Sequence, residues 1–153
     1  MSRPLNWSVG AAGAAILTLY MPQFEGMVLR GYQDPIGIVT ACAGHTATAV
    51  LGKPYTREEC ERLLDEDLAV HAEGAMMCVE APLTTGQRAA VVSFAFNVGV
   101  DRFCNSTFAR RLNEGDQGAC EELAKWTLAG GQQLPGLVKR RATEIAICRG
   151  EIG

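Results

Sequence analysis

The sequence from residue 25 to residue 46 reads Glu25-Gly-Met-Val-Leu-Arg-Gly-Tyr-Gln-Asp34-Pro-Ile-Gly-Ile-Val-Thr40-Ala-Cys-Ala-Gly44-His-Thr46. Glu25 follows an apolar segment, and burial there favours the protonated carboxyl that a general acid requires. Asp34 lies in a polar turn, where we expect it to stay ionised. Two carboxyl groups in contrasting environments suit the division of roles in glycoside cleavage, and the Thr40 hydroxyl could hold a water molecule. Taken alone, such a pair is weak evidence, because most acidic residues are solvated surface groups.

The composition is that of one compact domain with a real core. The chain has 153 residues, of which 48% are apolar and 20% charged, and its net charge is -3. A chain of this length buries roughly 70% of the surface that its unfolded form exposes. The composition excludes intrinsic disorder, collagen and coiled coil, and a pI near 5.4 gives no support to nucleic-acid binding.

The charge is distributed unevenly along the chain. Residues 1–85 hold five Lys/Arg against ten Asp/Glu, a sum of -5, whereas residues 86–153 hold nine against seven, a sum of +2. The mildly basic second half either faces an anionic polymer or reflects ordinary surface variation. The sequence favours neither alternative.

Six cysteines are many for a chain of this size. They form no CxxC pair and no close Cys/His cluster, so we expect no metal site. An even number at wide spacing favours up to three disulfides and an oxidising compartment, although buried free thiols are the alternative. We expect cysteines that are close along the fold to pair, as Cys42–Cys60, Cys78–Cys104 and Cys120–Cys148.

The N-terminal segment is similar to an export signal, with departures. Arg3 is followed by uncharged residues from Pro4 to Phe24, but four Ala and two Gly dilute the apolar centre between Val9 and Met21. Such a segment is barely hydrophobic enough to cross a bilayer as a helix. No small-x-small cleavage site follows it. We therefore predict that it targets the chain without being removed; the alternative is an Ala/Gly-rich buried helix.

Capping and turn residues divide the remainder into elements. Pro22 suggests a short helix to about Arg30, and the β-branched and aromatic residues of 32–50 suggest a small antiparallel sheet. Capping boxes begin helices at Thr56 and Thr84. Further helices are predicted over residues 106–113, 116–128 and 135–148. The pattern predicts an α+β fold, with a small antiparallel sheet lobe followed by a larger helical lobe.

Several motifs along the chain resemble the phage-type lysozymes, glycoside hydrolase family 24. The spacing of Glu25, Asp34 and Thr40 matches the catalytic motif of that family without a gap, although Ala43 replaces its usual aromatic or His residue. The similarity extends over roughly residues 24–148. Its other parts are Pro82-Leu83-Thr84-x-x-Gln87-x-Ala89, Ser93-Phe-Ala-Phe-Asn-Val-Gly99, Phe103-x-x-Ser106-Thr107, Leu112-Asn113-x-Gly115-Asp116, Trp126-x-x-Ala-Gly-Gly131 and Leu134-Pro-Gly-Leu-Val-Lys-Arg-Arg141.

The resemblance implies a lysozyme-like fold and a muramidase without a cofactor. Such an endolysin hydrolyses the β-1,4 bond between N-acetylmuramic acid and N-acetylglucosamine in peptidoglycan and so lyses the host bacterium. Glu25 would protonate the glycosidic oxygen. Asp34 and Thr40 would position the attacking water on the opposite face, as in an inverting reaction.

Other polar residues have alternative roles, which the sequence leaves open. Asn97, Arg140 and Arg141 are candidates for binding the glycan. Asn97 could equally be a helix C-terminal amide, and the two arginines could face Glu25, although the Lys-Arg-Arg run favours a solvated surface. We expect the histidine that follows Gly44 to be a structural hydrogen-bond partner and His71 to be exposed to solvent.

Within this family the chain is most similar to signal-arrest-release endolysins. That resemblance implies an N-terminal tethering segment at residues 1–23 and a catalytic domain at residues 24–153. The chain would be exported to the host periplasm, tethered transiently to the inner membrane and then released, as a monomer whose partner is peptidoglycan. Two alternatives are a catalytically inactive peptidoglycan-binding module of the same fold and a small membrane-associated interaction protein. The intact acids argue against the first.

Overall fold

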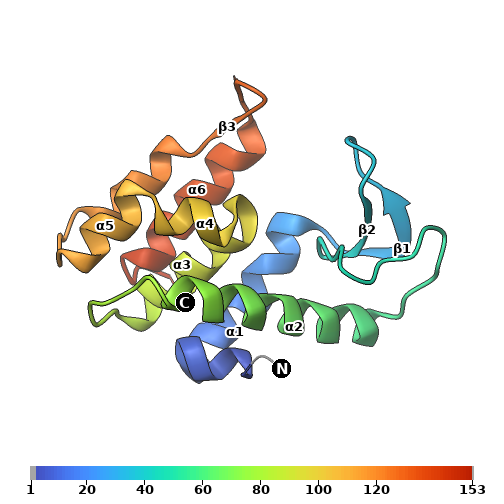
Figure 1. Ribbon diagram of the computed structural model, residues 1–153, viewed down its shortest axis with the longest axis horizontal. Helices are drawn as coiled ribbons and strands as arrows, with labels where there is room; N and C mark the ends of the chain where they lie inside the picture. Colours follow the sequence, from blue (N-terminus) through green and yellow to red (C-terminus); the bar gives the residue numbers. More distant parts are fainter. Residues whose placement is uncertain (1–2, 153) are drawn as a thin grey trace.

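The protein has two lobes that share one long helix. The structure, a computed structural model, describes residues 3–152. Helix α2 (Arg57–Met76) runs along both lobes, with the strand pair at one end and the remaining helices at the other (Figure 1). The other elements are α1 (Leu5–Glu25), β1 (Val28–Gln33), β2 (Val39–Cys42), α3 (Thr85–Val98), α4 (Val100–Cys104), α5 (Thr107–Asn113), the 3-10 helix η1 (Ala119–Lys125), β3 (Leu128–Ala129), β4 (Gln132–Gln133) and α6 (Pro135–Cys148).

Helix α1 contains most of the apolar N-terminal segment and packs against α2 and α3. A break at Gly10, with φ 76° and ψ 167°, separates a short first helix from a longer second one. The buried side of α1 contributes Leu5, Val9, Gly13, Ile16, Leu17 and Met21. In the described residues, no helix has both the length and the hydropathy needed to cross a membrane.

The prediction that Pro22 begins a helix was wrong. Pro22 lies inside α1, which ends at Glu25 because Gly26 adopts φ 79° and donates its N–H to the Pro22 carbonyl at 2.9 Å. The residues from Val28 onward then form β1, because their backbone groups pair with β2. Such pairing outweighs a weak local preference for helix.

The predicted small antiparallel sheet is confirmed. Tyr32 pairs with Thr40 and Gln33 pairs with Val39, and the register shifts between Val28 and Tyr32. The turn after β1 lies at one end of the strand pair, and the turn after β2 lies at the other end, where the chain enters β1 from α1. Of the two, the turn after β2 is the one that contacts Glu25, the last residue of α1.

Helix α3 is the core of the helical lobe. The Thr84 hydroxyl and the Gln87 side chain form a complete capping box at its start, and every residue from 89 to 95 is buried. The Phe94 ring makes edge-on contacts with Phe103, Phe108 and Trp126, at centroid distances of 5.1–6.3 Å. A helix buried on all sides was predicted here, and the packing confirms it.

The segment between α5 and α6 differs from the predicted helix over 116–128. The Asp116 carboxylate accepts the N–H of Gly118 at 2.8 Å, which forms a local turn in place of a helix cap. A 3-10 helix follows, and Gly130 and Gly131, at φ 59° and 81°, then form the turn of the β3–β4 hairpin. Positive φ at both residues suits a tight hairpin turn.

All six cysteines form disulfides in the predicted pairs. Cys42–Cys60 joins β2 to α2, and Cys78–Cys104 joins the segment after α2 to α4. Cys120–Cys148 joins η1 to α6. The crosslinks therefore tie different elements to one another within both lobes.

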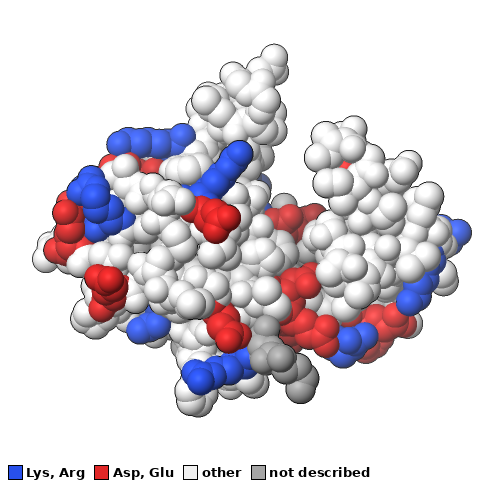
Figure 2. All heavy atoms as spheres, viewed as in Figure 1, with Lys and Arg blue, Asp and Glu red and all other residues white. Residues whose placement is uncertain are grey.

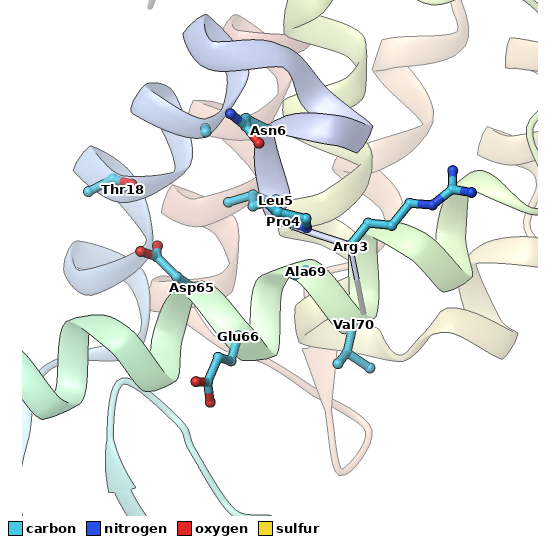
Figure 3. A pocket seen from close by; sticks show the side chains of 10 residues that line it. Arg3, Pro4, Leu5, Asn6, Thr18, Asp65, Glu66, Ala69 and Val70 are labelled. Atoms are coloured by element: carbon cyan, nitrogen blue, oxygen red, sulfur yellow. The ribbon is translucent and has the colours of Figure 1, made fainter. Parts of the chain in front are cut away.

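A cavity of about 610 Å³ remains where α1 packs against α2 (Figure 3). Ala14 and Thr18 of α1 line one side, and Asp65, Glu66 and Ala69 of α2 line the other. Burial, followed by the charge of Glu61, raises the pKa of the Asp65 carboxyl above its usual range. This space is open to solvent, since the exposed residues Glu66 and Val70 are part of its lining.

Candidate active site

Glu25 is the last residue of α1, and its side chain is only 19% exposed. The Arg140 guanidinium of α6 donates from Nη1 to Glu25 Oε2 and lies 4.8 Å from the centre of the Phe24 ring. The sequence predicted an apolar environment for this carboxyl. The structure adds a buried cation, supplied by a residue 115 positions further along the chain.

The turn after β2 lies against Glu25. Ala41 and His45 exchange both backbone hydrogen bonds at 2.9 Å, which closes a tight turn around Gly44 at φ 77°. A β-carbon at residue 44 would lie 3.2 Å from Glu25 Oε1. The positive φ favours glycine there, and a β-carbon would press against the Glu25 carboxyl.

His45 holds this turn in place, as predicted from the sequence. The ring is buried, with Nδ1 2.8 Å from Asp67 Oδ2 and Nε2 2.6 Å from the Thr48 hydroxyl. Both ring nitrogens are therefore engaged in structural contacts. The turn is fixed to α2 through Asp67.

Asp34 and Thr40 lie at the other turn of the strand pair, and both form hydrogen bonds with the backbone of Ile38. Asp34 Oδ1 accepts the backbone N–H groups of Ile36 at 3.0 Å and Ile38 at 2.8 Å. The buried Thr40 hydroxyl donates to the Ile38 carbonyl at 3.1 Å. Both carboxylate bonds go to Oδ1, so neither occupies Oδ2, which is the oxygen that can accept a proton from a water molecule.

The surface is hollowed between the two lobes. In Figure 2, viewed as Figure 1, a hollow separates a projection over the β1–β2 lobe from one over the β3–β4 hairpin, and acidic atoms lie in its floor. A separate pocket of about 350 Å³ adjoins Gly44 and includes His71 and Phe96. The prediction that His71 is exposed was wrong, because it is half-buried and the centre of its ring lies 4.9 Å from that of Phe96, with the two rings tilted by 50°.

Arg140 and Arg141 are buried, at 5% and 1% exposure, so the solvated face favoured from the sequence was wrong. Both side chains turn inward because a buried carboxylate, Glu144, accepts hydrogen bonds from each of them. Arg141 also donates to the exposed Asn97 amide oxygen and to the Trp126 carbonyl. The structure thus joins Asn97 and Arg141, and joins Arg140 to Glu25.

Glu144 was missed by the sequence analysis. It is fully buried on α6 and also accepts the Ser93 hydroxyl of α3. One signal for it exists in the sequence, since Glu144 follows Arg140 and Arg141 by four and three residues, the spacing at which helical side chains meet. That spacing alone does not distinguish a buried pair from a solvated one.

The molecule has two lobes with a hollow between them. A carboxylic acid at the end of one helix faces a short strand pair. This combination is typical of a lysozyme-type glycosidase. The sequence model of the phage lysozyme family matches residues 22–144. The chain belongs to the phage lysozyme family. Lysozymes hydrolyse peptidoglycan, and this chain is accordingly a muramidase that acts on the bacterial cell wall.

Relatives of known sequence and structure agree with this assignment. The chain is 42% identical over 126 residues to the SAR-endolysin of Enterobacteria phage P21, covering 81% of this chain and 76% of that protein. The SAR-endolysin of Bacteriophage PS119 is 40% identical, covering 81% and 75%. Among solved structures, the muramidase domain of SpmX from Asticaccaulis excentricus has a TM-score of 0.81 at 35% identity, covering 91% of this chain and 95% of that one. A P22 lysozyme mutant has a TM-score of 0.78 at 30% identity, covering 92% and 97%.

Proposed function

We propose that the chain is an endolysin that cleaves the β-1,4 bond between N-acetylmuramic acid and N-acetylglucosamine, with Glu25 as the general acid. The observation that carries the proposal is the contact of the Glu25 carboxyl with the Gly44 turn, in the same strand pair that bears Asp34 and Thr40. A glycan in the hollow between the lobes would lie between the acid and the turn that holds Asp34.

The roles follow from the hydrogen bonds of each group. Glu25 donates its proton to the glycosidic oxygen as the bond to the anomeric carbon breaks. A water molecule held by Asp34 and Thr40 attacks that carbon from the opposite face and gives its proton to Asp34 Oδ2. The backbone N–H groups of Ile36 and Ile38 support the carboxylate through Oδ1. Attack on the opposite face inverts the anomeric configuration.

The N-terminal segment supports a second part of the proposal. The relatives named SAR-endolysins match most of the chain, and residues 4–24 carry no charge. Residues 1–23 would tether the exported chain to the inner membrane of the host, and residues 24–153 would form the catalytic domain in the periplasm. While tethered, Glu25 would be held at the bilayer surface. Release lets α1 pack against α2 and α3, which completes the site of a monomeric enzyme.

The test is the lysis of chloroform-treated Gram-negative cells by the wild-type chain and by Glu25→Gln. We expect the variant to fold, by circular dichroism, and to lose lysis by several orders of magnitude, because it cannot supply the proton. A variant that keeps more than a small fraction of the activity would refute the role of Glu25. A chain that binds purified cell walls without releasing new reducing ends would be the inactive binding module.

The stereochemistry is tested separately on a soluble peptidoglycan fragment. Proton NMR of the first product distinguishes the α-anomer, expected from inversion of a β-glycoside, from the β-anomer. An initial β-anomer would show that the reaction is retaining. In that case Asp34 would not act through a water molecule.

A further inference from the structure

A buried cluster of charged groups lies behind Glu25. Glu144 Oε2 accepts from Arg140 Nε at 3.2 Å, and Glu144 Oε1 accepts from Arg141 Nη1 at 2.6 Å. The Ser93 hydroxyl donates to the same carboxylate from α3. Arg140 therefore touches two carboxylates at once, Glu25 at its tip and Glu144 at its Nε.

The cluster poses a problem for a general acid. A guanidinium in direct contact favours the ionised form of a carboxyl group, whereas Glu25 must carry a proton in order to donate it. Two arginines act on it, since Glu25 contacts Arg140 and is coupled electrostatically to Arg141. A compensating negative charge is needed close to both arginines.

Glu144 is the group that provides this charge. It is fully buried, so water screens its charge little. Burial lowers the pKa of the Arg141 guanidinium, and Glu144 opposes that effect most strongly. In the described part of the chain, Glu144 forms its ion pairs with Arg140 and Arg141, and Ser93 is its hydrogen-bonding partner from α3.

We infer that Glu144 is a positioning residue that orients Arg140 toward Glu25 and offsets the charge of both arginines, so that the Glu25 carboxyl meets less net positive charge. The inference rests on the proposed role of Glu25 as the acid. Glu144 itself touches neither the Glu25 carboxyl nor the hollow, and it acts through Arg140. Its spacing from the two arginines on α6 is what allows one carboxylate to pair with both.

The test is a charge series in the full chain: Glu144→Gln, Arg141→Gln and the double variant. Glu144→Gln removes a negative charge beside Arg140 and Arg141 and should move the alkaline limb of the lysis–pH profile to lower pH. Arg141→Gln removes a positive charge and should move that limb to higher pH. The double variant removes one of each and should return to the wild-type value. The readouts are carbon NMR titration of the Glu25 carboxyl and the alkaline limb of the lysis–pH profile.

The outcomes separate an electrostatic role from a merely structural one. A merely structural role predicts a loss of activity with an unchanged midpoint of the lysis–pH profile, or midpoint shifts of the same sign in both single variants. Either result would overturn the inference. If Glu144→Gln does not fold, Arg141→Gln and the double variant still test it, because the first must raise the midpoint and the second must restore it. Retained lysis by Glu25→Gln would instead refute the proposed acid, while the NMR titrations would still report on the cluster.

Discussion

The backbone of Gly44 faces the carboxyl group of Glu25 so closely that a β-carbon there would lie 3.2 Å from Oε1. The contact joins the end of α1 to the turn after β2, which are separate parts of the fold. The geometry of Glu25 thus depends on a residue that contributes no side chain of its own.

Replacing Gly44 by alanine should therefore damage catalysis more than stability. Displacement of the acid by a few tenths of an ångström predicts a loss of lysis of up to roughly 10-fold. The positive φ adds a cost of about 1–2 kcal/mol to the free energy of folding. Lysis rates and thermal unfolding of Gly44→Ala measure both effects.

Gly52→Ala is the matched control for this variant. Gly52 has φ 78°, nearly that of Gly44, but a β-carbon there would meet nothing within 4 Å. It should lose a similar amount of stability and retain lysis. Equal losses of activity in the two variants would show that strain, and not contact with Glu25, is responsible.

Asp34→Asn should reduce lysis by less than Glu25→Gln. The amide can still accept the N–H groups of Ile36 and Ile38, and Thr40 can still hold the water, but no group then takes the proton. A loss of roughly 100- to 10,000-fold is expected for removal of a general base. Thr40→Ser, which keeps the hydroxyl, should be much closer to wild type than Thr40→Ala. If Asp34→Asn lyses cells at the wild-type rate, another group activates the water.

The hydropathy of α1 should control the time of lysis. Leucine at Gly10 or Gly13 would also disturb the folded helix, because Gly10 has φ 76° and a β-carbon at Gly13 would lie 2.9 Å from that of Val9. Ala11 and Ala15 are exposed on α1. The variant Ala11→Leu/Ala15→Leu therefore raises hydropathy without disturbing packing, and it should stay longer in the membrane fraction and delay lysis.

A polar version of the same variant tests the opposite direction. Ala11→Gln/Ala15→Gln leaves the packed side of α1 intact and lowers its hydropathy, so membrane retention should fall. Both purified variants should lyse chloroform-treated cells at the wild-type rate. If both lyse intact host cells on the wild-type schedule, or if the released protein begins after Met21, the tether is not regulatory.

Filling the cavity between α1 and α2 should stabilise the folded position of α1. Ala69 lines this cavity from α2, so Ala69→Leu adds apolar contacts without changing the N-terminal segment. A gain of about 0.5–2 kcal/mol in the free energy of unfolding is expected. Ala72→Leu is the control, because Ala72 is fully buried outside the lining of the cavity and overpacking there should destabilise. A lower melting temperature for Ala69→Leu would contradict the prediction.

Local signals predicted much of the helical lobe. The capping box at Thr84, the hydroxyl of Ser106 and the ring of Pro135 each act within one turn of a helix, and all three helices begin where these residues indicate. The disulfide pairs were also predicted, since each joins cysteines that are neighbours along the fold.

The errors arose where distant residues decide the structure. Pro22 is a helix-start signal, yet here the helix continues through it from Leu5 to Glu25. Arg140 and Arg141 have the composition of a solvated surface, and their burial depends on Glu144 and Glu25. Their environment forms where α1, α3 and α6 pack together, and a local sequence pattern does not encode that packing.

The disulfides crosslink one part of the molecule covalently and leave another part held by noncovalent packing. All three crosslinks lie between residues 42 and 148, and α1 contains no cysteine. The acid at the end of α1 is thus attached to a helix that is held by noncovalent packing, whereas the turns that receive it belong to a covalently braced body. Subglobal opening of this one helix disconnects the acid and leaves the rest of the scaffold assembled. Redocking restores the site without any disulfide having to form again.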